Sequence, residues 1–431
     1  MDRIKIIGGS KLIGSIPISG AKNAALPLMI ASLLSEGTLT LKNIPHLADI
    51  TLLSRILGDL GANITIDGRG SQGVDDEISG VTMHINVPKI SNFFAKYELV
   101  SKMRAGFWVI GPLLARTGRA KVSLPGGCAI GTRPVDLHLK ALQELGADIK
   151  LEDGYVNAAA PNGLKGARIK FPKVSVGATH NILMASTLAS GQTIIENAAK
   201  EPEVVDLVRC LRAMGANIEG EGTSVINIEG VTQLNSAEHT VLPDRIEAGT
   251  YAMAVAMTGG SLTLMNVNGK NLQYPLNIMK AMGVECLEHS NNLHITQSNN
   301  NLKPIDIETN PYPGFPTDLQ AQIMAMMTQA DGLSRIRETI FENRFMHVQE
   351  LARLGADITL DGDIAIIKGV TKLQGAQVMA TDLRASVSLV IAALAAKGET
   401  IVNRVYHLDR GFEDIEKKLS RCGAIIERLT D

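Results

Sequence analysis

Residues 47–66 read LADITLLSRILGDLGANITI. Leucine and isoleucine recur in the first part at helical spacing between polar residues, which predicts an amphipathic helix with one buried face. We expect this helix to end at Leu60-Gly61-Ala62, because glycine readily takes the left-handed conformation that closes a helix. The β-rich residues Ala62–Ile66 that follow predict a strand. The segment is therefore a helix, a tight turn and a strand, and the chain repeats it.

An apolar residue, a glycine and then an alanine or valine precede a predicted strand six times, at Gly61, Gly146, Gly215, Gly283, Gly355 and Gly423. Successive glycines are 85, 69, 68, 72 and 68 residues apart. A second phrase, an alanine-rich run that ends at a glycine, lies 23 to 28 residues ahead of each, at Gly37, Gly118, Gly191, Gly259, Gly332 and Gly398. Two glycine registers that keep step along the whole chain indicate six copies of one unit of roughly 70 residues.

Each unit contains two kinds of helix. The first kind is apolar nearly all round, as in 24–34, 319–330 and 385–396, and helices of this kind belong inside a core. The second kind is the amphipathic helix described above. The unit is thus predicted to run strand, helix, strand, helix, strand. With the apolar helices inside, the sheets must form the outside, which inverts the usual α/β barrel.

Three units amount to roughly 210 residues, which is close to the upper size for one hydrophobic core. Two globular halves of three units each are therefore expected. The first apolar helix begins directly after Lys22, so the strand-forming residues before it are expected to pair elsewhere. The predicted fold class is α/β, a two-domain inside-out α/β barrel.

The composition of the 431 residues, 45% hydrophobic and 20% charged, is typical of a globular protein with large cores. A net charge of −2 without a basic run argues against nucleic-acid binding. Four scattered cysteines without a C-x-x-C pair argue against a disulfide framework or a cysteine zinc site. The start has no apolar signal segment, and the long uncharged stretches 174–195 and 248–269 are interrupted by polar residues and glycine. We therefore expect no membrane span and a cytoplasmic location.

Polar residues gather at the starts of the apolar helices, where unpaired N–H groups and the positive end of the helix dipole attract anions. Cations recur at these points, at Lys22, Arg104 and Arg384, which together favour an anionic ligand between the halves. Each cation alone is also compatible with a solvated surface position. Thr317 and Thr381 fit plain N-caps as well as site residues.

Residues 124–134, LPGGCAIGTRP, contain three glycines and two prolines, a composition typical of a constrained loop that moves as a lid. Cys128 in this loop is a candidate reactive thiol, and the nearby Arg133 would favour its thiolate form. The alternative for a free cysteine is a small buried hydrophobe, to which we assign the other three, Cys210, Cys286 and Cys422. A cysteine hydrolase triad stays open, because nine histidines are present, although none lies in a comparable motif.

Two C-terminal turns place arginines after predicted strands, in FENRF at 341–345 and HLDRG at 407–411. Arginine binds phosphate and carboxylate through two parallel hydrogen bonds, which lysine cannot do. A small ligand that carries both groups needs several such cations, so Arg344 and Arg410 join the candidate site.

Five motifs together carry a resemblance over essentially the whole chain: GAKNAALP at 20–27, the 124–134 loop, FPTD at 315–318, FENRFMH at 341–347 and ATDLRAS at 380–386. They resemble the enolpyruvyl transferase family, in the branch that acts on UDP-N-acetylglucosamine. The resemblance implies two inside-out α/β domains of three units each. It places the N-terminal domain at 22–241 and the C-terminal domain at 242–431, completed by the N-terminal segment 1–21.

The resemblance also implies an activity. Enolpyruvate would pass from phosphoenolpyruvate to the 3′-hydroxyl of UDP-N-acetylglucosamine with release of phosphate, by addition and elimination through a tetrahedral ketal. This is the first committed step of bacterial peptidoglycan biosynthesis. No metal and no organic cofactor are implied, and a phosphonate-bearing epoxide inhibitor is expected to alkylate Cys128.

Carried onto this chain, the family roles imply that Cys128 protonates the methylene carbon of phosphoenolpyruvate and that Asp318 is the base near the sugar hydroxyl. Phosphoenolpyruvate would be held by Lys22, Asn23, Arg133 and Arg410, of which Lys22 and Arg410 also count as catalytic. Supporting cations would be Arg344 and Arg384. The UDP-sugar would contact Arg104, Arg133, Pro134, Val135, Asp136, Leu137, Lys173, Val174, Ser175, Val176, Gly177, Asp318 and Ile340.

Two alternatives remain. The 5-enolpyruvylshikimate-3-phosphate synthases share the fold and the donor, but the Cys128 loop and residues 173–177 argue against them. A non-catalytic repeat scaffold that senses nucleotide sugars is opposed by the full set Lys22, Cys128, Asp318 and Arg410.

Overall fold

The computed structural model describes residues 2–67, 80–126, 135–298, 302–370 and 372–430. The chain divides into two compact units, which are described separately. Of the described residues, 2–19 and 243–430 form the C-terminal unit, and 20–242 form the N-terminal unit. The described residues build six four-stranded sheets, three in each unit.

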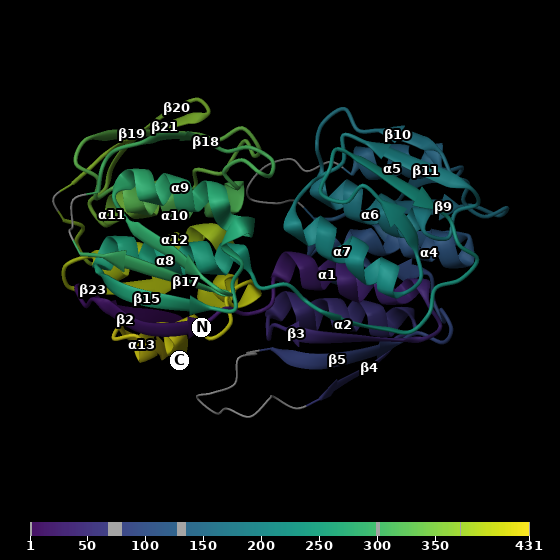
Figure 1. Cartoon of the computed structure of the whole chain (residues 1–431), viewed down its shortest axis with the longest axis horizontal. Coiled ribbons are helices and arrows are strands. Elements are labelled where there is room, and N and C mark those ends of the chain that lie inside the picture. Colours follow the sequence, from purple (N-terminus) through teal and green to yellow (C-terminus); the bar gives the residue numbers. More distant parts are fainter. Residues whose placement is uncertain (1, 68–79, 127–134, 299–301, 371, 431) are drawn as a thin grey trace. The chain divides into compact units, whose positions relative to one another are not determined.

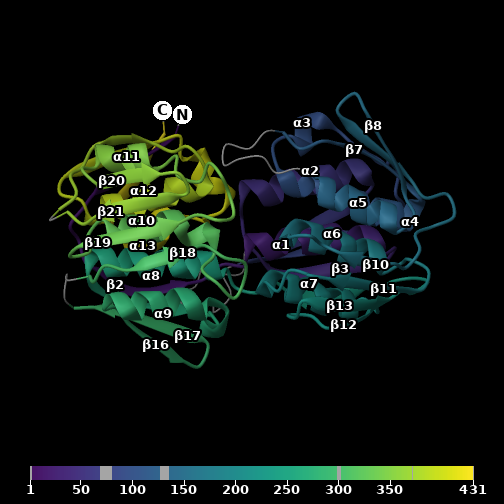
Figure 2. The same ribbon diagram turned by 90° about the horizontal axis from the view of Figure 1, so that it is seen from above.

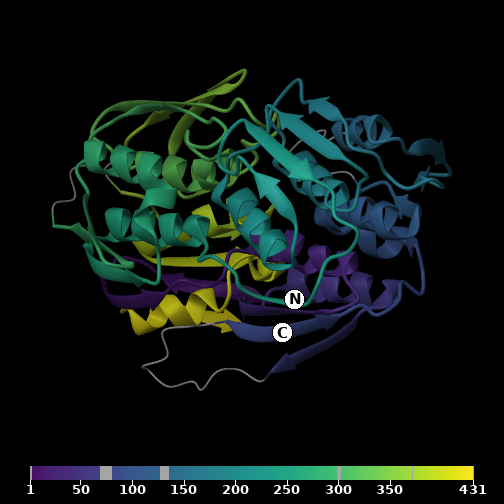
Figure 3. The same ribbon diagram turned by 45° about the vertical axis from the view of Figure 1, so that its right-hand side comes forward.

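The three sheets of the C-terminal unit include the first strands of the chain. Their orders are β22(Gln377–Met379)-β23(Glu399–Asn403)-β1(Arg3–Ile7)-β24(Ile425–Leu429), β16(Glu285–His289)-β17(Asn292–Gln297)-β15(Gly260–Met265)-β2(Leu12–Pro17) and β18(Asp306–Glu308)-β19(Leu333–Arg337)-β21(Ile364–Lys368)-β20(Asp357–Asp361). β1 is antiparallel to β23 and β24, and β2 is parallel to β15. Figure 3 shows these purple N-terminal strands among the green and yellow elements of this unit.

The N-terminal unit repeats the same sheet pattern. Its sheets are β14(Ala237–Thr240)-β3(Thr38–Ile44)-β5(Val81–Asn86)-β4(Asn63–Asp67), β6(Phe94–Ala95)-β7(Arg119–Ser123)-β9(Tyr155–Ala159)-β8(Asp148–Glu152) and β10(Arg168–Lys170)-β11(Gln192–Glu196)-β13(Val225–Glu229)-β12(Asn217–Glu219). In each sheet one outer pair is parallel and the other two pairs are antiparallel.

The inner helices of the C-terminal unit are α8 (Arg245–Thr258), α10 (Gln320–Met327) and α12 (Leu383–Ala395). Nearly every residue of these helices is buried, and the three pack against one another. Figures 1 and 2 show them enclosed by the sheets of this unit. The inner helices of the N-terminal unit are α1 (Lys22–Ala31), α4 (Ile110–Thr117) and α6 (Val176–Ser186). The prediction that apolar helices lie inside and sheets outside is confirmed.

The amphipathic helices end as predicted. They are α2 (Ala48–Leu60), α5 (Asp136–Glu144), α7 (Pro202–Ala213), α9 (Gln273–Met282), α11 (Val348–Arg353) and α13 (Ile415–Arg421). The six glycines of the first phrase have φ between 89° and 112°, the left-handed region in which an L side chain is strained. Other short helices are α3 (Tyr97–Val100), η2 (Arg104–Val109) and η3 (Gly269–Leu272).

Two details differ from the prediction. Two inner helices, α1 and α10, are shorter than predicted, because 3-10 turns occupy some of their ends, at η1 (Ser32–Leu34) and η4 (Thr317–Leu319). The third, α12, begins two residues earlier than predicted. Each of the six sequence repeats also ends in a two-stranded hairpin. A repeat therefore has four strands where three were predicted. The missed strand β13, VINIE, alternates buried and exposed residues after a glycine-containing turn. No helix among the described residues has the length and apolarity needed to cross a membrane.

Candidate active site

Three predicted site residues of the C-terminal unit, Asp318, Arg344 and Arg384, meet directly before α10. Asp318 lies in η4, directly before α10, and its two carboxylate oxygens accept hydrogen bonds from two arginines. Arg344 Nη2 is 3.0 Å from Oδ1, and Arg384 Nη2 is 2.8 Å from Oδ2. The side chain of Asp318 is 26% exposed, whereas those of the arginines are 4% and 6% exposed. One carboxylate therefore faces solvent while it bridges two buried cations.

The sequence left open whether Thr317 and Thr381 are plain N-caps or site residues, and the hydrogen bonds at the helix starts decide this. Asp382, and not Thr381, is the N-cap of α12, because its carboxylate accepts from the backbone N–H groups of Arg384 and Ala385. The hydroxyl of Thr317 donates to Glu338 and caps no helix. Neither threonine is therefore a plain N-cap.

Arg410 ends the short helix η5 (Val405–Arg410), which packs against α12. The neighbouring Asp409 is bound by Arg428 of β24, with Nη2 of Arg428 2.6 Å from Oδ1 and Nη1 3.1 Å from Oδ2. Arg428 also donates from Nε to Glu416 at 2.8 Å. Burial lowers the pKa of His407 in the same helix, and the positive charge of Arg410 lowers it further. The segment that carries Arg410 is thus tied to the last strand of the chain.

Lys22 and Asn23 open α1 in the N-terminal unit. Lys22 Nζ is 2.6 Å from Oδ2 of Asp49, and the two side chains are 10% and 4% exposed. Lys22 is therefore a buried, paired cation and not a solvated surface group. Asp49 lies in the first turn of α2, and sequence reasoning did not single it out. Asn23 is half-buried.

The remaining predicted contacts of the UDP-sugar in this unit lie at the starts of three helices. Arg104 begins η2 and is half-buried. Val135 and Leu137 at the start of α5 are buried, whereas Asp136 is exposed. Residues 173–177 span the start of α6, where Ser175 is the N-cap and its hydroxyl accepts from the backbone N–H of Ala178 at 3.3 Å. Ile340, the contact predicted from the C-terminal unit, is half-buried.

Three histidines that the sequence did not single out are fully buried: His138, His180 and His347. Burial lowers the pKa of His138 to about 3, and those of His180 and His347 to about 4. The ring of His180 lies 5.4 Å from that of Trp108. These groups, called the buried histidines below, are neutral near pH 7.

The predicted residues Cys128, Arg133 and Pro134 lie outside the described residues. The other three cysteines, Cys210, Cys286 and Cys422, are buried, which confirms their assignment as small hydrophobes. Burial raises the pKa of Cys210 and Cys286 to about 12, and it also raises that of Cys422. Among the described residues no three His, Cys, Asp or Glu side chains cluster as metal ligands.

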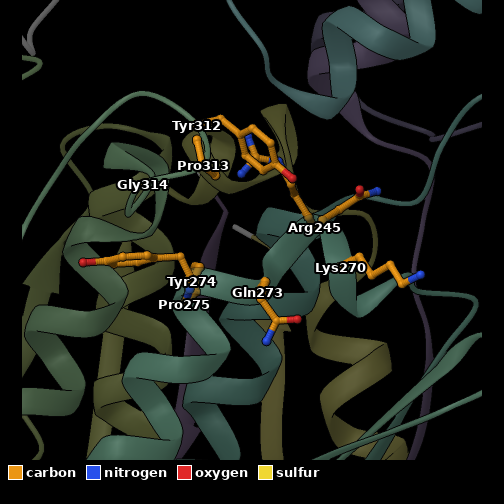
Figure 4. A pocket seen from close by; sticks show the side chains of 9 residues that line it. Arg245, Lys270, Gln273, Tyr274, Pro275, Tyr312, Pro313 and Gly314 are labelled. Atoms are coloured by element: carbon orange, nitrogen blue, oxygen red, sulfur yellow. The ribbon is translucent and has the colours of Figure 1, made fainter. Parts of the chain in front are cut away.

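A hollow in the C-terminal unit is lined by the start of α8, by η3 and α9, and by residues 312–314. Figure 4 shows the ring of Tyr312 above the side chain of Arg245, with Gln273 and Pro275 of α9 below. The Arg245 guanidinium lies 5.6 Å from the centre of that ring. No predicted site residue lines this hollow. We therefore place the candidate site at the helix starts instead.

The chain matches the sequence model of the family "EPSP synthase (3-phosphoshikimate 1-carboxyvinyltransferase)" over residues 6–419. It therefore belongs to this family of carboxyvinyl, or enolpyruvyl, transferases. Two curated relatives have the more particular name UDP-N-acetylglucosamine 1-carboxyvinyltransferase. The protein from Agrobacterium fabrum is 64% identical over 433 residues and that from Azorhizobium caulinodans 63% over 430 residues, with 100% of both chains covered in each case.

Solved structures confirm the predicted fold. The enolpyruvyl transferase NikO from Streptomyces tendae superposes with a TM-score of 0.85 at 24% identity, covering 100% of this chain and 99% of that one. EPSP synthase from Acinetobacter baumannii superposes with a TM-score of 0.76 at 19% identity, covering 100% of both chains. At these identities the likeness concerns the fold alone.

Proposed function

We propose that the protein transfers the enolpyruvyl group of phosphoenolpyruvate to the 3′-hydroxyl of UDP-N-acetylglucosamine and releases phosphate. The observation that carries this proposal is the identity of 63–64% over the full chain to relatives named for this reaction. The product would enter peptidoglycan biosynthesis as its first committed intermediate, in the cytoplasm. The site residues described above support the same reaction.

In the addition step, a proton from the Cys128 thiol goes to the methylene carbon of phosphoenolpyruvate, and the sugar oxygen bonds to C2. Asp318 takes the hydroxyl proton. Its two oxygens accept from Arg344 and Arg384, and a carboxylate has about four acceptor positions; the side chain is also 26% exposed. Elimination then breaks the bond between C2 and the phosphate oxygen. The methyl group gives a proton back to the Cys128 thiolate as the double bond returns, and the proton held by Asp318 leaves with the phosphate.

The cations supply the electrostatic part of the mechanism. Lys22, Arg133 and Arg410 would hold the phosphate and carboxylate of the donor, and Asn23 would orient its reacting carbon. Preorganised charges of this kind are usually the largest catalytic contribution, because they need no rearrangement during the reaction. Arg344 and Arg384 are already held in place by Asp318.

The test is phosphate release by the purified protein from phosphoenolpyruvate with UDP-N-acetylglucosamine or shikimate 3-phosphate as acceptor. Mass spectrometry of the sugar nucleotide identifies the enolpyruvyl ether. We expect phosphate release with UDP-N-acetylglucosamine as the acceptor and none with shikimate 3-phosphate. Turnover only with shikimate 3-phosphate, or binding of the sugar nucleotide without phosphate release, would overturn the proposal in favour of the synthase or the sensor.

A further inference from the structure

Glu338 follows β19 in the C-terminal unit and is 5% exposed. Its Oε1 accepts from the hydroxyl of Thr309 at 3.0 Å and from the backbone N–H groups of Ile340 and Phe341 at 2.9 and 3.1 Å. Its Oε2 accepts from the hydroxyl of Thr317 at 2.9 Å. One buried carboxylate thus gathers donors from three separate segments of the chain.

These partners lead directly to the candidate site. Thr317 is the neighbour of Asp318 in η4, so its bond to Glu338 fixes the start of the turn that presents the Asp318 carboxylate. Ile340 and Phe341 begin the turn that carries Arg344, whose guanidinium lies 5.4 Å from the Phe341 ring centre and binds Asp318. Glu338, Thr317, Asp318, Arg344 and Phe341 therefore form a closed ring of contacts.

The chemistry of this arrangement restricts the positions of its donors. A buried carboxylate is costly unless hydrogen bonds satisfy it, and ionised acceptors form bonds roughly twice as strong as neutral ones. If η4 or the turn at 340–344 moves away, Glu338 loses hydrogen bonds that offset the cost of burying its carboxylate. Both segments are held in one relative position before any ligand arrives.

We propose that Glu338 is a positioning residue, which holds the base Asp318 and its partner Arg344 at the separation the reaction needs. It touches no substrate and acts through Asp318. This inference rests on the proposed function for its catalytic part, whereas its structural part does not.

The variant that tests it is Glu338→Gln, which keeps the size of the side chain but replaces one acceptor oxygen by an NH₂ group that cannot accept. We expect kcat to fall about 10²-fold, the loss typical of a reacting group misplaced by about 1 Å. The decisive comparison is the double variant with Asp318→Asn. If Glu338 acts through Asp318, the double variant turns over no more slowly than Asp318→Asn alone. Losses in kcat that multiply would overturn the proposal.

Two threonines provide a matched pair, since both donate a hydroxyl to the same carboxylate. Thr317→Val removes the bond to η4, and we expect it to lower kcat at least 10-fold, by the same misplacement. Thr309→Val removes the bond on the far side, where Oε1 keeps two backbone donors, and it also removes the acceptor of the Thr339 N–H group. It therefore disturbs the local structure at least as much as Thr317→Val but leaves η4 tied to Glu338, and it should change kcat less than about 3-fold. Equal losses of kcat in the two variants would indicate a merely structural role and refute the assignment. This pair also decides the question if Glu338→Gln does not fold.

Hydrogen exchange provides a readout that is independent of catalysis. In Glu338→Ala the backbone amides of Ile340 and Phe341 should exchange at least 10-fold faster, because the oxygen that accepts from both is removed. Unchanged exchange would refute the positioning role even if the wild-type enzyme is active. Faster exchange in a wild-type protein that does not turn over these substrates would instead refute only the proposed function.

Discussion

The buried pair of Lys22 and Asp49 gives the sharpest test of the electrostatics of the N-terminal unit. In Asp49→Asn the carboxylate charge is lost while the shape of the side chain is kept. The ammonium group of Lys22, 2.6 Å away and 10% exposed, then remains buried opposite a neutral amide. A buried charge that loses its partner is strongly destabilising, because its desolvation is no longer offset.

The magnitude follows from the geometry. Coulomb attraction at 2.6 Å with an effective dielectric constant of about 20 is roughly 6 kcal/mol, which sets an upper limit. Breaking a buried pair typically costs about 3–5 kcal/mol, and the amide oxygen of asparagine still accepts a hydrogen bond. We therefore expect Asp49→Asn to lower the free energy of unfolding of this unit by about 2–4 kcal/mol. For a unit of roughly 200 residues this lowers Tm by about 4–16 °C.

The assay is thermal and urea unfolding of the full chain, with Glu238→Gln as the control. Glu238 pairs with Lys42 in the same unit, but their side chains are 61% and 42% exposed, so we expect a loss below about 1 kcal/mol. Adding Lys22→Met to Asp49→Asn should recover part of the stability, because the buried charge that lost the Asp49 carboxylate is removed. An Asp49→Asn protein as stable as the wild type, or a double variant with purely additive losses, would refute this reasoning.

Three further predictions concern other parts of the chain. A thiol-reactive phosphonate epoxide should label Cys128 and spare the three buried cysteines, because their raised pKa values disfavour the thiolate. Peptide mass mapping measures this, and label found mainly on those three would contradict it. The buried histidines have folded-state pKa values below the ordinary 6.5, so the stability linked to them is fully present above about pH 6.5 and is lost as the pH falls towards 4. Urea unfolding should show that the free energy of unfolding falls by about 1–2 kcal/mol per histidine between pH 7 and 5. In His180→Leu the dependence of this free energy on pH should be weaker by the equivalent of about one proton. Arg428→Met should raise KM for phosphoenolpyruvate about 10-fold, because the segment that carries Arg410 loses its bonds from Arg428 to Asp409. Tm is the control for general unfolding, and an unchanged KM would show that these bonds do not position Arg410.

Local patterns in the chain determined the architecture. The helix that ends at Gly61 and the strand after it follow from helical spacing and from the left-handed conformation of glycine, both of which depend on neighbouring residues alone. The apolar helices lie inside because their composition leaves no polar face for water. The strand β13 was missed, although it alternates buried and exposed residues, because five residues after a turn give a weak signal.

Partners far apart in the chain were decided only by the tertiary structure. Asp318 meets Arg384 across 66 residues, and Ser19 at the end of the N-terminal segment meets Glu413 across 394. The motifs marked Arg384 as a cation at a helix start and Arg344 as a cation in a turn after a strand, but only the folded chain places both against Asp318. Nothing local distinguished Asp49 or Glu338 from an exposed acid, because the burial of a charge depends on which donors the folded chain places around it.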